Sequence, residues 1–462
     1  MDKSIIIGDQ IKAYYSNHAS LAAIGRKVKQ RKVFEPIVQK VQITQNTVRY
    51  SPSDKLMDAF ITLLAGGARM VEVNHRLKAD PGLQRAFGRQ DCAEQSVVQD
   101  TLDTCSAENV RQMQQVIDCI LRKESRTDHY DFVLEWQVLD TDMTGRPYGR
   151  KAKFAPKGYF AKQRNRRGRQ EGYVIGTWYE EIVMECLFDG KTQLNAALKP
   201  LIEAVETALE LDENQRKRTI LRIDSGGGSV DDPNWVLTRG YPVHAKDYSG
   251  VRANALAKTV SQWITDPADS SHAMGWVMSE DTPYCRLLKR VAVRCRKKNG
   301  QWAVVLIIST LSPQDVLHLM GGQNYEANDP KAVLLADVNF YDLRGGGVEI
   351  EIKEDKQGLA TAKRNKKRFE AQQVLLQLEV LAHHVAVWAR DWLTPYCPKM
   401  ARLGLKRLVR DVFQINGMLI FDQAIDFLHI ILNQADPLAC DLCKGLAPLF
   451  SPEQVAITLG ET

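Results

Sequence analysis

The segment from residue 131 to 224 most constrains what this chain can fold into, because its pattern changes from strand to helix and back. "DFVLEWQVLDTDMTG" alternates apolar and polar residues, which places Phe132, Leu134, Trp136 and Val138 on one face of a strand. A second strand region, "GYVIGTWYEEIVMECLFDG", precedes the amphipathic helix "TQLNAALKPLIEAVETALEL" and a third strand, "TILRID". This order predicts a mixed α/β sheet.

The flanking regions have different textures. Apolar residues at helical spacing over 52–122 fit a DNA-binding helical domain and equally a structural helical bundle. Mostly short strands follow the third strand, and "KKNG" is a hairpin turn signal among them. We therefore predict a helical N-terminal domain, a first part of the α/β core, a β-rich insertion, the closing helices of the core and a small mixed C-terminal region, over 1–125, 126–230, 231–335, 336–398 and 399–462.

Composition fits an ordinary globular protein: 44% of the 462 residues are hydrophobic and 26% are charged. The longest apolar runs, such as 302–308, reach about half the length that crosses a bilayer, so we expect no membrane segment. The N-terminus does not read as a secretory signal, and nine cysteines without a regular framework indicate reduced thiols in a cytoplasm. Cys440 and Cys443 form a single CxxC pair, which favours packed thiols over zinc.

A basic stretch lies between the first two strand regions. Residues 146–169 hold ten Lys or Arg residues and no acid, with Tyr148, Phe154, Tyr159 and Phe160 interleaved. Such a stretch can neutralise phosphates while its aromatic rings anchor the loop. A solvated basic loop is the equally open alternative.

Three acids occupy suggestive positions. Asp142 ends one strand, Asp224 ends another before three glycines, and Glu349 follows three more glycines at the start of a predicted helix. Carboxylates at strand ends and on a neighbouring helix can converge at one sheet edge and hold divalent cations, and oxygen ligands suit Mg²⁺ or Mn²⁺. Acids at such positions are also common helix caps. Asp140 has the same strand parity as Asp142 and stays open as an alternative first acid.

Over about residues 50–440 the sequence resembles the DDE-type transposases of bacterial insertion sequences, in particular the cut-and-paste insertion-sequence-four superfamily. Asp142-Met143-Thr144 matches the family's D-x-T pattern, and residues 221–226 match its LRxDSG strand. Tyr341, Arg344, Glu349 and Lys356 match its Y-R-E-K helix motif, with one extra residue between Arg344 and Glu349.

Helix geometry separately favours Glu349 over its neighbours. At 100° per residue, Lys353 and Lys356 both lie within about 40° of Glu349, whereas Glu351 lies about 160° from Glu349. A metal-binding carboxylate on the same helix face as two lysines that can contact phosphate makes physical sense. An exposed salt bridge from Glu349 to Lys353 would produce the same pattern.

The resemblance implies an RNase H-like mixed-sheet catalytic core, interrupted by a β-rich insertion and preceded by a helical N-terminal domain. It implies that Asp142, Asp224 and Glu349 are catalytic and hold two Mg²⁺ ions, with Mn²⁺ as a substitute. The partners it implies are double-stranded DNA, at element ends and target, and a second copy of the chain in the DNA complex. The expected DNA contacts are Tyr341, Arg344, Lys353, Lys356, Arg164, Arg166, Arg167, Lys366 and Lys367.

The implied reaction is Mg²⁺-dependent cleavage at the ends of an insertion sequence followed by strand transfer, in a bacterial, nucleoid-associated setting. Related cut-and-paste enzymes place a flipped base on an aromatic residue of the insertion, for which Trp235, Trp263, Trp276 and Trp302 are candidates. A place in the hydrophobic core is the more common role for each of these tryptophans, and the sequence does not choose among them. Two other functions fit the same residues. One is an RNase H-like DNA nuclease that does not join strands, and the other is an inactive, transposase-derived DNA-binding protein.

Overall fold

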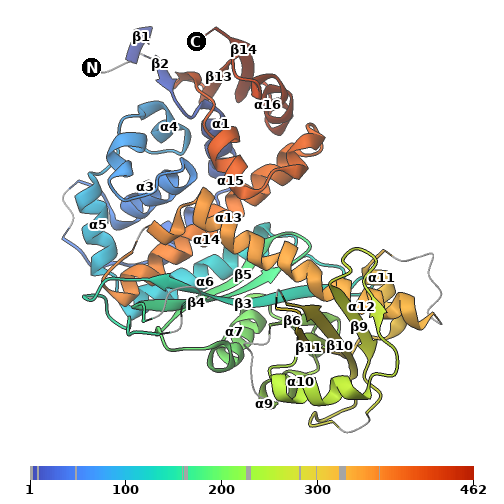
Figure 1. The fold of residues 1–462 in the computed structure, drawn as a ribbon. Coiled ribbons are helices and arrows are strands. Elements are labelled where there is room, and N and C mark those ends of the chain that lie inside the picture. The colour runs from blue at the N-terminus through green and yellow to red at the C-terminus, as the bar shows by residue number, and fades with distance from the viewer. Residues whose placement is uncertain are drawn as a thin grey trace. The chain divides into compact units, whose positions relative to one another are not determined.

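The computed structural model describes residues 4–7, 10–46, 49–158, 160, 165–224, 230–279, 282–297, 299–321, 329–363 and 365–461. The chain divides into two compact units (Figure 1). The terminal unit comprises Met1–Ser125, Pro147–Lys153 and Glu351–Thr462, and the central unit comprises Arg126–Arg146 and Phe154–Ile350. This division differs from the five consecutive regions expected from the sequence, because both ends of the chain contribute to one unit.

The central unit is built on a mixed sheet of nine described strands in the order β5-β4-β3-β6-β7-β11-β10-β9-β8. In the centre, β6 pairs in parallel with β3 on one side and β7 on the other, while β4 and β5 form an antiparallel hairpin. The strands β3 to β11 cover Gln137–Pro147, Gly168–Gly176, Glu181–Phe188, Thr219–Ile223, Val243–Lys246, Ile264–Thr265, His272–Trp276, Lys289–Arg296 and Trp302–Ser309. The predicted mixed α/β fold class is therefore correct.

The predicted β-rich insertion does not form a separate layer. Its strands join the core sheet edge to edge, since β7 pairs with both β6 and β11. The "KKNG" signal is confirmed: β10 and β11 are antiparallel, and Gly300 between them has the positive φ (80°) that a tight hairpin turn requires. Backbone pairing thus continues across the predicted boundary at residue 231.

The first strand begins later than predicted. Residues 132–135 form a turn, in which the Asp131 carboxylate accepts hydrogen bonds from the backbone N–H groups of Val133 and Leu134 at 3.0 and 3.3 Å. The side chains of Val133 and Leu134 are exposed. Local side-chain capping therefore overrides the alternating pattern in this stretch.

Helices cover the sheet of the central unit. α7 (Leu194–Ala208) packs on β4 and β5, and α12 (Pro330–Gly346) packs on β9, β10 and β11 (Figure 1). The apolar core beneath α12 includes Val138, Ile220 and Phe340. The shorter helices α8, α9, α10, η3 and α11 cover Glu213–Lys217, Asp231–Thr238, Gly250–Leu256, Ala257–Thr259 and Pro313–Leu319.

A row of buried polar residues also lies in register across the sheet. Asp140 of β3 is paired with Arg222 of β6, and Arg222 is paired with His244 of β7. The Arg222 guanidinium donates to both carboxylate oxygens of Asp140 at 2.7 Å and to the Phe340 carbonyl at 2.6 Å. Arg222 thus joins two strands to α12.

The row continues into β11 and β10. His244 pairs in register with Ser309, which pairs with Lys289. The His244 ring contacts the Ser309 hydroxyl at 3.0 Å and the Asp337 carbonyl of α12 at 2.9 Å, and Lys289 donates to the Asp337 carboxylate at 2.7 Å. Burial lowers the pKa of His244 to about 3, so this ring stays neutral. Five strands therefore use polar side chains in one row, and three of these side chains bind α12.

The terminal unit contains a five-stranded sheet in the order β1-β2-β12-β13-β14, formed from both ends of the chain. β2 (Ile11–Ser16) and β12 (Gly417–Asp422) are antiparallel neighbours. β1, β13 and β14 cover Ser4–Ile7, Phe427–Asn433 and Val455–Gly460. The region 399–462 is therefore not a separate small domain.

The expected helical character of residues 52–122 is confirmed. α14 packs against α3, α5 and α6, which places the predicted closing helix in the same unit. α1, α2, α3, α4, α5 and α6 cover Ala19–Gln30, Glu35–Lys40, Pro52–Leu64, Pro81–Ala86, Gln95–Thr104 and Ala107–Glu124. α13, α14, α15 and α16 cover Val348–Gly358, Phe369–Leu393, Leu405–Arg407 and Ala439–Leu446, and the short turns η1, η4, η5, η6 and η7 cover Val73–Leu77, Thr361–Lys363, Pro398–Arg402, Leu408–Val412 and Ala447–Leu449. Within the described residues, no helix is both long enough and apolar enough to cross a membrane.

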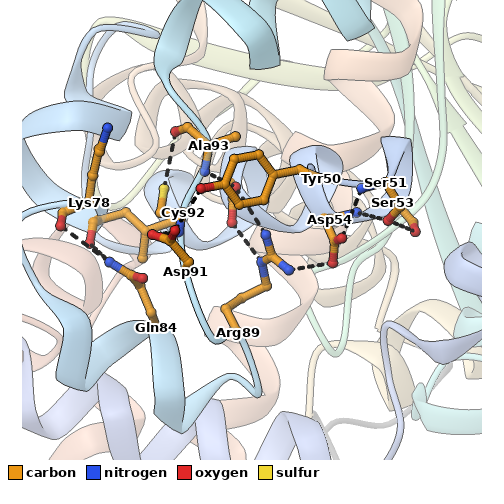
Figure 2. Close-up of polar contacts among 12 residues, drawn as sticks. Tyr50, Ser51, Ser53, Asp54, Lys78, Gln84, Arg89, Asp91, Cys92 and Ala93 are labelled. Carbon is orange, nitrogen blue, oxygen red and sulfur yellow. Dashed lines mark hydrogen bonds and ion pairs between the residues drawn. The ribbon is translucent and has the colours of Figure 1, made fainter. Parts of the chain in front are cut away.

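A polar network fixes the start of α3 (Figure 2). Ser51 and Asp54 form a capping box, in which each side chain bonds the other residue's backbone N–H. Arg89 contacts Asp54 and donates to the fully buried Asp58 at 2.8 Å. Because Asp58 has no access to water, Arg89 and the Ala93 N–H, at 2.9 Å, supply its hydrogen bonds.

Replacing Arg89 with Met removes the cationic partner of the buried Asp58. We expect the free energy of unfolding to fall by about 3–5 kcal/mol, because an unpaired carboxylate remains buried. Arg111→Met is the matched control, since Arg111 pairs with Glu108 on an exposed helix face and should change stability by less than about 1 kcal/mol. Urea unfolding followed by tryptophan fluorescence measures both changes, and equal effects would contradict this role for Arg89.

Candidate active site

Asp142 and Asp224 lie on adjacent parallel strands. The register Thr141↔Ile223 places them one residue further along β3 and directly after β6. The carboxyl ends of parallel strands meet at one sheet edge, which is why acids 82 positions apart in the sequence become neighbours. Both side chains line the same hollow of about 240 Å³, together with Gln170 and Gln193.

Asp140 and Asp142 share a strand face but have different surroundings. Asp140 is completely buried, and its Oδ2 also accepts a hydrogen bond from the Thr177 hydroxyl at 2.9 Å in addition to the two from Arg222. Asp142 is partly open, with a side chain 19% exposed, and accepts from its neighbour Met143 N–H at 2.7 Å. The geometry makes Asp140 a structural ion-pair partner and leaves Asp142 accessible.

Helix α12 brings two further predicted residues to these acids. The Tyr341 hydroxyl donates to Asp224 at 3.2 Å, and a terminal nitrogen of Arg344 lies 3.4 Å from the Asp142 carboxylate. Arg344 also donates to the Thr141 carbonyl at 2.8 Å. The spacing of three residues puts Tyr341 and Arg344 on one face of the helix, so both side chains reach the same sheet edge.

Glu349 enters from the next helix. The three glycines do not form a turn before a single helix. Gly345 and Gly346 complete α12, and Gly347 separates it from α13. The Glu349 carboxylate lies 3.8 Å from Arg344 and is 63% exposed, whereas Glu351 on the same helix is buried. The predicted difference between these two glutamates is therefore present, and Tyr341 and Arg344 reach the acids despite the extra residue.

Charges at the site influence one another. Burial raises the pKa of Asp142, Arg344 opposes this shift, and the carboxylates of Asp224 and Glu349 add to it. Burial also raises the pKa of Tyr341, and the Asp224 carboxylate raises it further. For Arg344, the neighbouring carboxylates outweigh the burial that would lower its pKa, so its pKa is raised and it stays cationic. The guanidinium of Arg344 thus supplies positive charge between Asp142 and Glu349.

The carboxylates have the chemistry of a Mg²⁺ site: oxygen ligands whose mutual repulsion a cation would relieve. Within the described part of the chain, no three His, Cys, Asp or Glu side chains are grouped closely enough to hold a metal ion in this arrangement. The donor types therefore fit Mg²⁺, and Arg344 provides the compensating charge in the geometry shown.

The other predicted DNA contacts have different environments. Arg166, Lys353 and Lys367 are exposed, Arg167 and Lys356 are half-buried, and Arg164 lies outside the described residues. Lys366 is 4% exposed and its ammonium donates to Gln99, so it is a poor candidate for contact with a phosphate.

Two residues of the basic stretch are also structural. Arg146 and Arg169 are buried, and Arg146 pairs with the buried Glu171. The basic stretch is therefore not uniformly a solvated arm.

Sequence reasoning missed the residues that hold α12 in place. Arg222 was read only as part of a motif, while His244, Ser309 and Asp337 were not singled out. A charged residue in the middle of the apolar strand "TILRID" was the available signal, because a buried Arg requires a partner.

No protein-family model matches the sequence, and no curated protein matches it significantly. Among solved structures, the chain is similar to one described as a cryo-EM structure of a piggyBac transposase synaptic complex with hairpin DNA. The TM-score is 0.43 and the sequence identity is 12%, over 84% of this chain and 79% of that chain. At this score and identity the likeness defines neither the fold nor the function of the chain.

Asp140→Asn and Asp142→Asn should have opposite effects on stability. Asp140→Asn leaves the buried Arg222 without its charged partner, and we expect a loss of about 3–5 kcal/mol. The pKa of Asp142 is raised on folding, so its charged form costs stability at neutral pH, and this cost disappears as the pH falls through the folded pKa and below the unfolded value. Asp142→Asn should therefore stabilise the protein at pH 7 and have little effect in acid.

Urea unfolding at pH 7 and at pH 3 measures both variants. A loss of stability for Asp142→Asn at pH 7 would contradict the assigned direction of its pKa shift. A neutral effect of Asp140→Asn would contradict the structural role of the Asp140–Arg222 pair.

The glycines differ in the space around them. A Cβ on Gly347 would lie 3.3 Å from Asp140 Oδ2 and 3.4 Å from the Leu343 carbonyl, whereas a Cβ on Gly345 meets nothing within 4 Å. Since Arg222 holds Asp140 in place, Gly347→Ala should destabilise the protein by about 1–3 kcal/mol. Gly345→Ala, its control in the last turn of α12, should stabilise it by about 0.5–1 kcal/mol. Thermal unfolding compares the two, and equal changes would show that the close approach at Gly347 is unimportant.

Proposed function

We propose that the chain is a DNA transposase of the DDE type, of the insertion-sequence-four superfamily. It cleaves phosphodiester bonds at the ends of an insertion sequence and transfers the freed strands into target DNA. The observation that carries this proposal is the meeting of Asp142 and Asp224, at the end of two parallel strands, with Tyr341, Arg344 and Glu349 from α12 and α13.

The proposed catalytic core is RNase H-like and comprises the β5-β4-β3-β6-β7 part of the sheet with α7, α9 and α12. Two features support this assignment. Its three parallel strands place the acids at their carboxyl ends, and the polar row fixes the helix that faces them. The strands β8 to β11 then extend the core rather than form an independent insertion.

Asp142, Asp224 and Glu349 would hold two Mg²⁺ ions, for which Mn²⁺ can substitute. When bound, such ions lower the pKa of a water molecule and stabilise the departing 3′ oxygen. The chemistry of the donor set supports this role, since Asp142 and Glu349 lie 3.4 and 3.8 Å from the Arg344 guanidinium, and the charges of Asp224 and Glu349 raise the pKa of Asp142.

The chain's own residues would bind and orient the DNA strand. Arg344 is 3% exposed and is fixed by its bond to the Thr141 carbonyl, so its guanidinium would supply positive charge beside Asp142 and Glu349 rather than contact the DNA backbone directly. Tyr341 keeps its proton because its pKa is raised, so its hydroxyl would donate to the Asp224 carboxylate and hold it in position. Arg166, Arg167, Lys353, Lys356 and Lys367 would neutralise the DNA backbone further from the reaction.

The proposed partners are double-stranded DNA, both as element end and as target, and a second copy of the chain. Two element ends must be cut in one transposition event, and a homodimer would supply one active site to each end. The net charge of +6 is compatible with this polyanionic partner.

The test incubates the full chain with Mg²⁺ and labelled DNA containing the element ends, which are identified as inverted repeats flanking the gene. Asp142→Asn, Asp224→Asn and Glu349→Gln should each lower the cleavage rate at least about a hundredfold, since each removes a charged ligand. Glu351→Gln is the matched control, because Glu351 is buried on the other side of α13 and should leave cleavage within about threefold of wild type.

The products separate the possible functions. Cleavage followed by joining to target DNA supports a transposase. Cleavage without joining supports the nuclease, and sequence-specific binding without cleavage by the wild type supports the inactive binding protein. Full cleavage by both Asp224→Asn and Glu349→Gln would overturn the site itself.

A further inference from the structure

Two adjoining hollows lie in the central unit, and the amino-terminal end of α12 lines the smaller of them. The larger has a volume of about 700 Å³ and the smaller about 460 Å³, and both are lined by Trp276 and Met278. Trp136 lines the larger hollow and Trp263 the smaller. We call the combined surface of Trp136, Trp263, Trp276, Met278, Arg286 and Lys289 the tryptophan groove.

The groove is remote from the carboxylates. Pro330, at the start of α12, lines the smaller hollow, and Tyr341 follows 11 residues later, which is about 16 Å along the helix. The larger hollow is lined by Lys217 and Pro242, which precede β6 and β7, whereas Asp224 follows β6. The groove is therefore at the opposite edge of the sheet and is not a pocket for a base displaced beside the reacting phosphate.

The tryptophan rings are fixed by their polar edges. The Trp136 indole N–H donates to Asp315 at 3.2 Å, and that of Trp276 donates to the Pro330 carbonyl at 3.2 Å. The Arg294 guanidinium lies 4.1 Å from the centre of the Trp263 ring. Both indole N–H groups thus have partners within the protein, and the Arg218 guanidinium lies 4.1 Å from the centre of the Trp136 ring, so Trp136 and Trp276 offer a ligand their remaining ring surface for stacking.

The two hollows differ in charge. The described lining of the larger one includes four cations, Lys217, Arg286, Lys289 and Arg290, and one acid, Asp315. Lys217 and Lys289 are paired with Glu213 and Asp337, which lie outside the lining. Arg286 is exposed, and its guanidinium makes a long contact of 3.5 Å with the Tyr241 carbonyl. The smaller hollow has Ile264, Pro330 and Leu334 beside the two tryptophans, and its one acid, Asp329, is balanced by its one cation, Lys331. The excess of cations thus suits phosphate in the larger hollow, and the two tryptophans suit a nucleobase in the smaller.

We propose that the tryptophan groove binds a single-stranded segment of DNA at least two nucleotides long. One base stacks in the smaller hollow on Trp263 and Trp276, the next lies against Trp136, and Arg286 contacts the phosphate between them. Aromatic platforms next to cations are the general means of holding single strands. Two hollows that share Trp276 and each have a further tryptophan favour a strand over one nucleotide. The choice of DNA rests on the proposed function.

The test measures fluorescence anisotropy of a labelled single-stranded hexanucleotide with the full chain carrying Asp224→Asn, so that the probe is not cut. Trp263→Ala and Arg286→Glu should each weaken binding about tenfold or more, and Arg286→Glu should lower the salt dependence by about one phosphate contact. Arg296→Glu is the matched control, because Arg296 is exposed on β10 but does not line either hollow. Circular dichroism verifies that each variant is folded.

The remaining arms use the same sequence as a duplex and a free mononucleotide as competitors. Weak competition by both supports the proposal. Equal competition by the mononucleotide overturns the strand assignment, and an equal loss for Arg296→Glu overturns the groove as the site. If the wild type cleaves no element-end DNA but the single strand still binds, the proposed transposase function is wrong and the groove stands. If the wild type cleaves element-end DNA but Trp263→Ala and Arg286→Glu do not weaken single-strand binding, only the groove is wrong.

Discussion

The buried pair of Asp140 and Arg222 is the interaction on which the rest of the candidate site depends. Burying two charges is costly, and the cost is offset only when every polar atom finds a partner. Here the Asp140 carboxylate also accepts a hydrogen bond from the Thr177 hydroxyl, and the remaining guanidinium nitrogen of Arg222 donates to the Phe340 carbonyl of α12. The pair consequently fixes β3, β6 and α12 together. An apolar pair of the same size would fill the space without specifying the register of the strands or the position of the helix along its axis.

Position along the strand, rather than residue type, separates the roles of Asp140 and Asp142. Both acids lie on the same face of β3, so the period of two places them next to the same helix. Asp140 lies where β6 still pairs, and a guanidinium reaches both of its oxygens. Asp142 lies one residue beyond the last pair, beside a hollow, and Arg344 lies 3.4 Å from its carboxylate. An acid beyond the end of the strand pairing can therefore bind a ligand, whereas an acid within the paired part holds the structure together.

The sequence predicted the parts of this arrangement that are local. The strand "TILRID", the "KKNG" hairpin, α7 and the contrast between Glu349 and Glu351 all follow from periodicity, and the structure contains them. The row from Asp140 to Lys289 could not be predicted, because it depends on the register of five strands that are far apart in the sequence. The same limit explains why the pairing of β2 with β12 was missed. At residues 132–135 the alternation of apolar and polar residues predicted a strand, but the Asp131 carboxylate accepts hydrogen bonds from the backbone there and holds it in a turn. A pattern of apolar residues does not reveal such hydrogen bonds.

Helix α12 links the two surfaces of the central unit, since Pro330 lines the tryptophan groove and Tyr341 and Arg344 reach the acids. Between these ends, Asp337 and Phe340 are bound to His244, Lys289 and Arg222. A helix can transmit a signal between two sites only if it has two stable positions. Moving α12 by even part of a turn would break three polar contacts at once, two of them buried, so the polar row opposes such a second position. A DNA strand bound in the tryptophan groove would therefore stay at a fixed distance from the carboxylates. The groove would position the DNA and would not act as a switch.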